Sequence, residues 1–426
     1  MKRIALCILA LIILGPLAII GFQWFHDPGS DRKSAAVADR AQLVARGEYL
    51  AKAGNCIACH TVRNGDAYAG GRAITTPFGK IYGPNITPDA ETGIGKWTAD
   101  DFWRAIHNGK SRDGQFLYPA FPYPNYTKVT RADADAIFAY LQNIKPVTQA
   151  NKDPELRFPY SRRTLLAFWR ALYFKPGEFE PQSSQSAEWN RGAYLVQGLG
   201  HCGACHTSRN ALGGTTTSAD LAGGMIPMQD WYAASLTSDP TTGLGNWTTR
   251  DVADLLRTGV SGRGAVFGPM SEVVYGSLQH LSQSDIESMA TYVKSVPESE
   301  APDVASAPVA EDARTVLELG ARIYRKQCVE CHKADGKGMP SAYPALAGSR
   351  SLTAQSAVNP IRMVFNGGYA PTTEGNPQPY GMPPFSGTLN DEEIAAVVSY
   401  IRMNWGNSGG LVSPVDVARY RGLPAE

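Results

Sequence analysis

The strongest constraint on this chain is a five-residue pattern, Cys-x-x-Cys-His, which occurs three times, at 56–60, 202–206 and 328–332. It is the attachment signature for c-type haem: two thiols bond the haem's vinyl groups and the adjacent imidazole becomes an axial ligand of the iron. The sequence therefore predicts three covalently bound haem c groups. Their attachment residues would be Cys56, Cys59, Cys202, Cys205, Cys328 and Cys331, with His60, His206 and His332 as iron ligands.

Two other uses of paired cysteines fit the pattern less well. A structural zinc site needs four ligands, whereas each copy supplies one cysteine pair and one histidine. A thioredoxin-like redox motif needs a βαβ setting, and the sequence shows none. The formal net charge of +1 over 426 residues also argues against a nucleic-acid binder.

More than the haem motif repeats along the chain. A segment containing a glycine followed by a tyrosine precedes each motif, and residues 85–98 resemble residues 235–248. Each repeat closes with a helical pattern of apolar residues that has acidic residues near its start, at 131–144, 282–295 and 390–403. We therefore expect an all-α fold of three tandem class I-like cytochrome c domains.

Composition divides the chain into seven parts. The segment 161–185 is aromatic and basic, which is consistent with a connector helix packed on the first domain, a membrane-surface helix or a docking face for a partner subunit. Pro, Ala and acidic residues dominate the linker at 298–312, as in an extended tether. The predicted parts are an N-terminal anchor or signal (1–30), domain 1 (40–160), the connector (161–185), domain 2 (186–297), a linker (298–312), domain 3 (313–407) and a C-terminal tail (408–426).

An apolar run from Ile4 to Phe22 follows two basic residues at the N-terminus. As a helix it would span about 28 Å, close to the hydrocarbon thickness of a bilayer. Trp24 stands at the expected interfacial position, and the basic residues place the N-terminus in the cytoplasm. We expect a retained anchor in the inner membrane, with the rest of the chain on the periplasmic side. The alternative is a cleaved signal peptide with small residues at 36–38.

A low-spin haem c usually takes a methionine opposite its histidine, often from a loop before the closing helix. The third repeat offers Met382 in "YGMPPF", and the second offers Met270 in "FGPMSEVV". The first repeat has no methionine in the corresponding stretch. Aligning the first two repeats through Gly109 and Gly259 brings Phe121, in "YPAFPY", within one residue of Met270.

Three explanations remain open for the first haem. Its iron could be five-coordinate and high-spin, or another side chain could bind it, with His107 the candidate in this repeat. A ligand could also come from elsewhere in the chain or from a partner. The counterpart of His107 in the second repeat is Arg257, which suggests a shared role at the haem edge, such as contacting propionates.

Taken together, "GNCIACHT", "GHCGACHT", "NWTTRDVADLLRTG", "FGPMSEVV" and "YGMPPF" resemble the triple-haem cytochrome c subunit of bacterial membrane-bound dehydrogenases. The resemblance covers nearly all of residues 40–407. It implies that electrons pass from a molybdenum, quinoprotein or flavoprotein catalytic subunit through the haems to ubiquinone or a terminal oxidase. Members with methionine in the first domain read "YPAMPY" at the stretch that contains Phe121 here.

The leading hypothesis is therefore an electron-transfer subunit of an oxidoreductase, and no substrate site of its own is visible in the sequence. No glycine-rich nicotinamide fingerprint is present, because the glycine pairs lie in loops rather than between a strand and a helix. Two alternatives are a haem enzyme that uses an open first haem and a cytochrome c subunit of a terminal oxidase.

Overall fold

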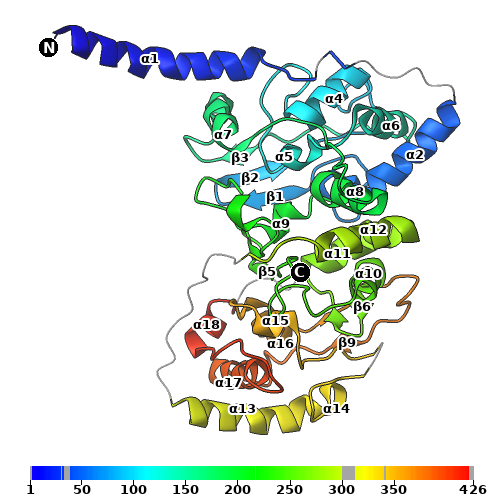
Figure 1. Ribbon diagram of the computed structural model, residues 1–426, viewed down its shortest axis with the longest axis vertical. Coiled ribbons are helices and arrows are strands. Elements are labelled where there is room, and N and C mark those ends of the chain that lie inside the picture. The colour runs from blue at the N-terminus through cyan, green and yellow to red at the C-terminus, as the bar shows by residue number, and fades with distance from the viewer. Residues whose placement is uncertain are drawn as a thin grey trace. The chain divides into compact units, whose positions relative to one another are not determined.

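The computed structural model divides into two compact units, which are described separately below (Figure 1). The first contains Met1–Ser184, Tyr194–Ala204 and Arg209–Thr215, and the second contains Gln185–Ala193, Cys205–Ser208 and Thr216–Glu426. The structure describes residues 2–29, 31–32, 39–215, 217–299, 312–339 and 342–421, without the side chains of residues 2, 5–13 and 217. The possible cleavage segment at 36–38 and most of the predicted linker at 298–312 lie outside the described residues. The three-domain division remains a prediction.

Helices form the framework, as expected. In chain order they are α1 (Lys2–Phe25), α2 (Arg40–Ala53), α3 (Cys56–His60), α4 (Ala99–Asn108), α5 (Tyr123–Tyr126), α6 (Arg131–Leu141), α7 (Leu166–Tyr173), α8 (Ala187–Tyr194), α9 (Gly203–His206), α10 (Thr249–Thr258), α11 (Pro269–Gly276), α12 (Gln283–Lys294), α13 (Ala313–Gln327), α14 (Val329–His332), α15 (Arg350–Thr353), α16 (Val358–Asn366), α17 (Asp391–Arg402) and α18 (Pro414–Ala418). A π-helical turn, η2 (Leu195–Leu199), and three 3-10 turns, η1 (Arg163–Leu165), η3 (Thr217–Ala219) and η4 (Leu278–His280), complete the set.

Short antiparallel strands form within the long loops between the helices. The all-α prediction therefore holds for the helical framework and is incomplete for the loops. Backbone groups in a long loop need hydrogen-bond partners, and a short ladder supplies them. The first unit contains a three-stranded sheet, and the second contains three two-stranded ribbons. The sheet is β1 (Ala73–Thr76), β2 (Gly79–Tyr82) and β3 (Glu155–Leu156); the ribbons are β4 (Gly224–Ile226) with β5 (Trp231–Ala233), β6 (Val260–Ser261) with β7 (Gly264–Ala265), and β8 (Gly368–Tyr369) with β9 (Gly381–Met382).

The first and last long helices of each repeat cross at a glycine, which explains the repeated glycine before each motif. The crossing pairs are α2 with α6, α8 with α12, and α13 with α17. A Cβ on the glycine would lie between 1.9 and 2.2 Å from a carbonyl oxygen of the crossing helix, so any side chain would force the helices apart. The glycines and the residues whose carbonyls they meet are Gly47 with Ala136, Gly192 with Ser288, and Gly320 with Ala396.

An arginine before the glycine fixes two of these crossings. Arg46 Nε donates to Asp133 at 2.8 Å, and Arg191 donates to Asp285 through Nε at 2.8 Å and Nη2 at 2.7 Å. In the third repeat Leu319 stands at the arginine position and packs against a hydrophobic core instead. The arginine therefore orients the closing helix in the first two repeats, whereas apolar packing does so in the third.

The α4 and α10 helices confirm the alignment of the first two repeats. Each begins with a capping box, from Thr98 or Thr248 to an aspartate three residues later. Each ends at a glycine in the left-handed conformation, Gly109 with φ 60° and Gly259 with φ 81°. The loops that follow these two glycines can therefore be compared, and counted from the glycines Phe121 falls within one residue of Met270.

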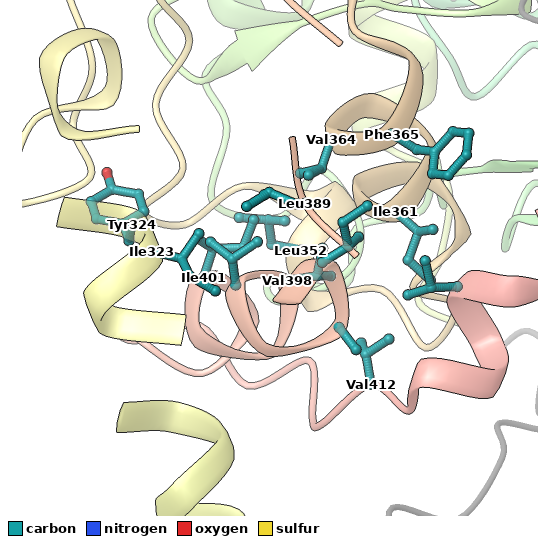
Figure 2. Close-up of a cluster of buried hydrophobic side chains, with 14 residues drawn as sticks. Ile323, Tyr324, Leu352, Ile361, Val364, Phe365, Leu389, Val398, Ile401 and Val412 are labelled. Carbon is teal, nitrogen blue, oxygen red and sulfur yellow. The ribbon is translucent and has the colours of Figure 1, made fainter. Parts of the chain in front are cut away.

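The best-defined core of the second unit surrounds α17 (Figure 2). Ile323 and Tyr324 come from α13, whereas Ile361 and Phe365 come from α16. Val412 and Val417 extend this core beyond residue 407, so the predicted C-terminal tail begins inside the packing of the third repeat.

The segment after α1 is held by buried donors of the first repeat. Lys110 Nζ donates to the carbonyl oxygen of Trp24 at 2.9 Å and also pairs with Asp27. Trp103 Nε1 donates to the carbonyl oxygen of Gly29 at 3.2 Å. Within the part of the chain that the structure describes, no helix is both long enough and apolar enough to cross a membrane.

The connector forms α7, and its inner face packs on the first repeat. Arg170 is buried, donates to the carbonyl oxygen of Asn108 at 2.5 Å, and its guanidinium lies 5.0 Å from the ring centre of Phe116. Leu165 and Leu172 face outward and are exposed. This arrangement favours a connector packed on the first repeat, with an apolar outer face.

Candidate haem-binding sites

Each Cys-x-x-Cys-His motif ends in a short helix that presents its histidine in the same way. The ring Nδ1 lies close to a backbone carbonyl oxygen: Pro84 at 2.7 Å for His60, Ala234 at 2.7 Å for His206 and Pro344 at 3.1 Å for His332. When Nδ1–H donates to this carbonyl, the lone pair is on Nε2, where it can bind a metal. All three motifs therefore hold the tautomer that haem ligation requires.

Burial keeps these three imidazoles neutral. It lowers the pKa of His206 to about 4, and it also lowers the pKa of His60 and of His332. In each case the hydrogen bond to the backbone carbonyl raises the pKa, but by less than burial lowers it. Neutral imidazole is the form that binds a metal ion. The motif histidines are thus prepared for ligation by both tautomer and charge.

The motif cysteines lack the lowered pKa of redox-active thiols. Burial raises the pKa of Cys56 to about 12 and that of Cys328 to about 11, whereas a reactive redox cysteine has a lowered pKa. Among the described residues, no group of three or more His, Cys, Asp and Glu side chains could hold a metal ion. The residues present therefore fit thioether attachment of haem, whose porphyrin supplies the remaining iron ligands.

The two candidate methionine ligands lie in different local structures. Met270 occupies the first turn of α11, whereas Met382 lies in β9, opposite Gly368 of β8, with its side chain against the core of the third repeat. Both are half-buried. Met228 and Met339 are exposed. The assignments of Met270 and Met382 as iron ligands remain predictions.

Phe121 lies in the loop between α4 and α5, two residues before α5, whereas Met270 lies inside α11. The Phe121 ring lies 5.3 Å from that of Tyr126, at an interplanar angle of 47°. Tyr126 is buried, and burial together with the neighbouring Cys56 and Cys59 thiols raises its pKa well above the ordinary value. Phe121 is therefore part of an aromatic cluster beside the first haem motif.

His107 is packed within the first repeat. Its ring stacks on Trp103 with centroids 4.2 Å apart, and its Nδ1 lies 3.5 Å from the hydroxyl of Thr127. Burial lowers its pKa to about 4. Its counterpart Arg257 donates to Gln283 at 2.5 Å. Neither the ligand role of His107 nor a shared propionate role has further support in these contacts, and both remain hypotheses.

A contact within the first unit, which sequence reasoning missed, joins the segments that carry the first and second motifs. The hydroxyl of Tyr126 donates to the carbonyl oxygen of Gly54 at 3.0 Å, two residues before Cys56. The Tyr126 ring also meets the ring of His201, which directly precedes Cys202, with centroids 5.4 Å apart at 86°. The only available signal was the histidine in "GHCGACH", which the motif pattern does not use.

The π-helical turn η2 accommodates a difference in length between the first two repeats. The stretch from the crossing glycine to the first cysteine is one residue longer in the second repeat than in the first. The extra residue is absorbed where Gly200 N donates to the carbonyl oxygen of Leu195 at 2.7 Å, a hydrogen bond that spans five residues.

Two cation–π contacts within the second unit were also missed. The Arg350 guanidinium lies 4.7 Å from the ring centre of Trp247, and that of Arg362 lies 4.4 Å from the ring centre of Trp231. Both arginines come from the third repeat and both tryptophans from the second. No short motif predicts such pairs, because the partners are more than a hundred residues apart in the sequence.

A profile of the cytochrome c family matches residues 44–145 and 317–405. Together with the helical framework and the motif geometry, this match defines the chain as a c-type cytochrome, a protein that carries haem c and acts in electron transfer.

Comparison with known proteins extends the similarity to most of the chain. The chain is 40% identical over 405 residues to the gluconate 2-dehydrogenase cytochrome c subunit of Pantoea cypripedii, covering 91% of this chain and 92% of the relative. It is 39% identical over 397 residues to the cytochrome c subunit of the alcohol dehydrogenase (quinone) of Gluconacetobacter polyoxogenes, covering 89% and 84%. It is 40% identical over 371 residues to a nicotinate dehydrogenase subunit of Pseudomonas putida, covering 85% of this chain and 30% of that protein. The chain belongs to the family of cytochrome c subunits of membrane-bound dehydrogenases.

Proposed function

We propose that this chain is the electron-transfer subunit of a periplasmic dehydrogenase complex and carries three covalent haem c groups. The observation that supports this most directly is the shared geometry of His60, His206 and His332, each with Nδ1 at a backbone carbonyl and Nε2 left for iron. Haem c supplies one-electron transfer when it is bound. The chain's own residues attach it and keep the proximal imidazoles neutral.

The donor in this proposal is a dehydrogenase catalytic subunit of molybdenum, quinoprotein or flavoprotein type. The names of the relatives refer to gluconate, to quinone-linked alcohol oxidation and to nicotinate, so they span several substrate classes. The acceptor is ubiquinone or a terminal oxidase. The chain itself supplies no substrate chemistry in this scheme and serves as a relay.

Met270 and Met382 complete the second and third haem sites in this proposal. Phe121 takes the methionine position in the first repeat, so the first haem remains a relay centre in a similar loop but with different axial coordination. A phenyl ring has no lone pair to offer iron. The sixth ligand of the first haem is left open between a vacant position, His107 and a group from elsewhere.

We further propose that the N-terminal segment is retained as an inner-membrane anchor with the haem-bearing repeats in the periplasm. The side chain of Lys110 is 1% exposed, and its charge is paired with Asp27. Cleavage after residue 38 would remove Asp27 and leave this buried cation without its counter-charge, which is costly. A retained segment avoids that cost, and the family's association with membrane-bound dehydrogenases agrees with it.

The test is to purify the full-length chain from membranes together with the proteins bound to it. Three haems per chain by pyridine haemochrome assay, a co-purified dehydrogenase and haem reduction by that enzyme's substrate would support the proposal. A chain with Cys56 and Cys59 both replaced by alanine should contain two haems and serves as the control for the count. Co-purification of a copper–haem oxidase subunit without any dehydrogenase would instead support the terminal-oxidase alternative.

A further inference from the structure

A half-buried arginine near the second haem motif lacks a counter-charge among the described residues. Arg350, at the start of α15, donates to the carbonyl oxygen of Ser235 at 2.7 Å and stacks on Trp247, which is 8% exposed. Burial lowers the pKa of Arg350 to about 10, with no carboxylate acting against it. A guanidinium has five N–H donors, so one carbonyl bond leaves most of them available.

The position of Arg350 is tied to the second proximal histidine through two successive carbonyl groups. His206 Nδ1 lies 2.7 Å from the carbonyl oxygen of Ala234, and Arg350 Nη1 lies 2.7 Å from that of the next residue, Ser235. The positive charge of Arg350 also contributes to the lowered pKa of His206, after the larger effect of burial. The two side chains therefore lie close to the same short piece of backbone.

A second unsatisfied donor lies near the other candidate ligand of this haem. Trp231 is 7% exposed, and its Nε1 has no hydrogen-bond partner among the described residues. Its indole packs so closely on Gly268 that a Cβ there would lie 2.7 Å from it, and Met270 follows two residues later. Buried polar groups are normally hydrogen-bonded, so this donor also needs an acceptor.

Haem c brings two propionate carboxylates, which supply the missing anion and acceptor. An arginine pairs with a carboxylate in a planar, charge-assisted arrangement that is stronger than a neutral hydrogen bond. We propose that Arg350 of the third repeat, together with Trp231 of the second, binds the propionates of the second haem. This inference rests on the proposed attachment of haem at 202–206 and identifies Arg350 and Trp231 as positioning residues.

The arrangement also makes the third repeat part of the second haem's environment. Arg350 lies six residues after Pro344, whose carbonyl oxygen is 3.1 Å from Nδ1 of His332. The segment 344–350 therefore contacts the proximal histidine of the third haem through Pro344 and, in this proposal, binds the second haem through Arg350. Neutralising a propionate stabilises the reduced iron, so Arg350 should raise the reduction potential of the second haem.

The test is spectroelectrochemical titration of the purified full chain carrying Arg350→Gln. With three haems still attached, one reduction potential should fall by about 59 mV. For a one-electron couple this corresponds to about a tenfold shift of the redox equilibrium towards the oxidised haem. The affected haem is identified as the one whose potential also moves in Met270→His. Trp231→Phe should lower the same potential by less, because it removes a neutral donor.

Arg421→Gln is the matched control. Arg421 also lies over an aromatic ring, with its guanidinium 5.0 Å from the ring centre of Phe365, but its charge is already paired with Asp391. Its replacement should leave all three potentials unchanged. Three attached haems with unchanged potentials in Arg350→Gln would overturn the inference, as would an equal shift in Arg421→Gln.

Arg350→Lys keeps the test decisive if Arg350→Gln does not retain the second haem. Lysine preserves the charge but loses the planar fork, so the second potential should still fall, by less than in Arg350→Gln. An unchanged potential in Arg350→Lys would count against the inference. Fewer than three haems in the wild-type chain would count against the proposed function itself, so the two failures are distinguishable.

Discussion

Tyr126 and His201 meet edge to face, with ring centroids 5.4 Å apart and an interplanar angle of 86°. Tyr126 also donates to the carbonyl oxygen of Gly54 at 3.0 Å. One buried tyrosine thus contacts the residues just before two haem-attachment motifs that are 146 positions apart in the sequence. Within the first unit, this side chain therefore joins the segment before Cys56 to the segment before Cys202.

Tyr126→Phe should destabilise the contact without disturbing its packing. The ring would remain against His201 and Phe121, but the buried Gly54 carbonyl would lose the hydroxyl donor, which costs about 1 kcal/mol. Denaturant unfolding of the haem-loaded chain, followed by Soret absorbance, measures the change. The control is Tyr118→Phe, whose exposed hydroxyl makes a long 3.4 Å bond to Ser161 and should contribute little. Equal losses in the two variants would argue against a special role for Tyr126.

The contrast between motif and contact shows what the sequence could reveal. The three motifs, the crossing glycines and the capped helices are short patterns that repeat, so their local structure follows from spacing and residue type. The contacts of Tyr126 with His201 and of Arg350 with Trp247 join distant segments. Their geometry depends on helix crossings and on the π-helical turn, which no local pattern encodes. His107 illustrates the same limit: as the free histidine of the first repeat it was a candidate haem ligand, and its contacts with Trp103 and Thr127 could not be read from the sequence.

Gly192→Ala should separate α8 from α12. The new Cβ would lie 1.9 Å from the carbonyl oxygen of Ser288, and backbone cannot yield as a flexible side chain can. Overpacking of this kind typically costs about 1–3 kcal/mol. Gly387→Ala is the control, because a Cβ at that position would meet nothing within 4 Å and its stability should be unchanged or slightly higher. Unfolding midpoints of the two variants give the comparison, and a tolerated Gly192→Ala would disprove the close crossing.

Phe121→Met should give the first haem a methionine ligand if its loop corresponds to that of the second repeat. The intensity of the near-infrared methionine–iron band should increase by the contribution of one haem. The reduction potential of the first haem should rise, because methionine ligation favours the reduced state. Met270→Ala and Met382→Ala should each reduce the band intensity by the contribution of one haem and lower the reduction potential of that haem. An unchanged band in Phe121→Met would show that position 121 does not face the iron, whereas unchanged titrations of the alanine variants would remove those two assignments.

The N-terminal segment should be present in the mature protein. Intact mass of the chain extracted from membranes should include Asp27, which is paired with the buried Lys110. Two truncations, each exported with a cleavable signal, separate anchoring from stability. Removing residues 1–25 should release the chain from membranes and keep the ion pair, unless the connector or a partner also holds it. Removing residues 1–38 should lower the free energy of unfolding by about 3 kcal/mol more, because the buried Lys110 charge then has no counter-charge. Equal stability of the two truncated chains would contradict this role of Asp27.

His107 should make the first repeat sensitive to acid. Burial lowers its folded-state pKa to about 4, whereas an unfolded histidine has a pKa of about 6.5. The unfolded chain therefore binds the proton first, so the stabilising contribution is complete above pH 6.5 and is lost as the pH falls towards 4. The loss is about 3 kcal/mol if the full difference in pKa is realised. His107→Phe keeps the stacking on Trp103 without a titrating group, so its stability should fall less between pH 7 and pH 4.5 than that of the wild type. Parallel pH profiles of the two chains would show instead that another group controls the acid response.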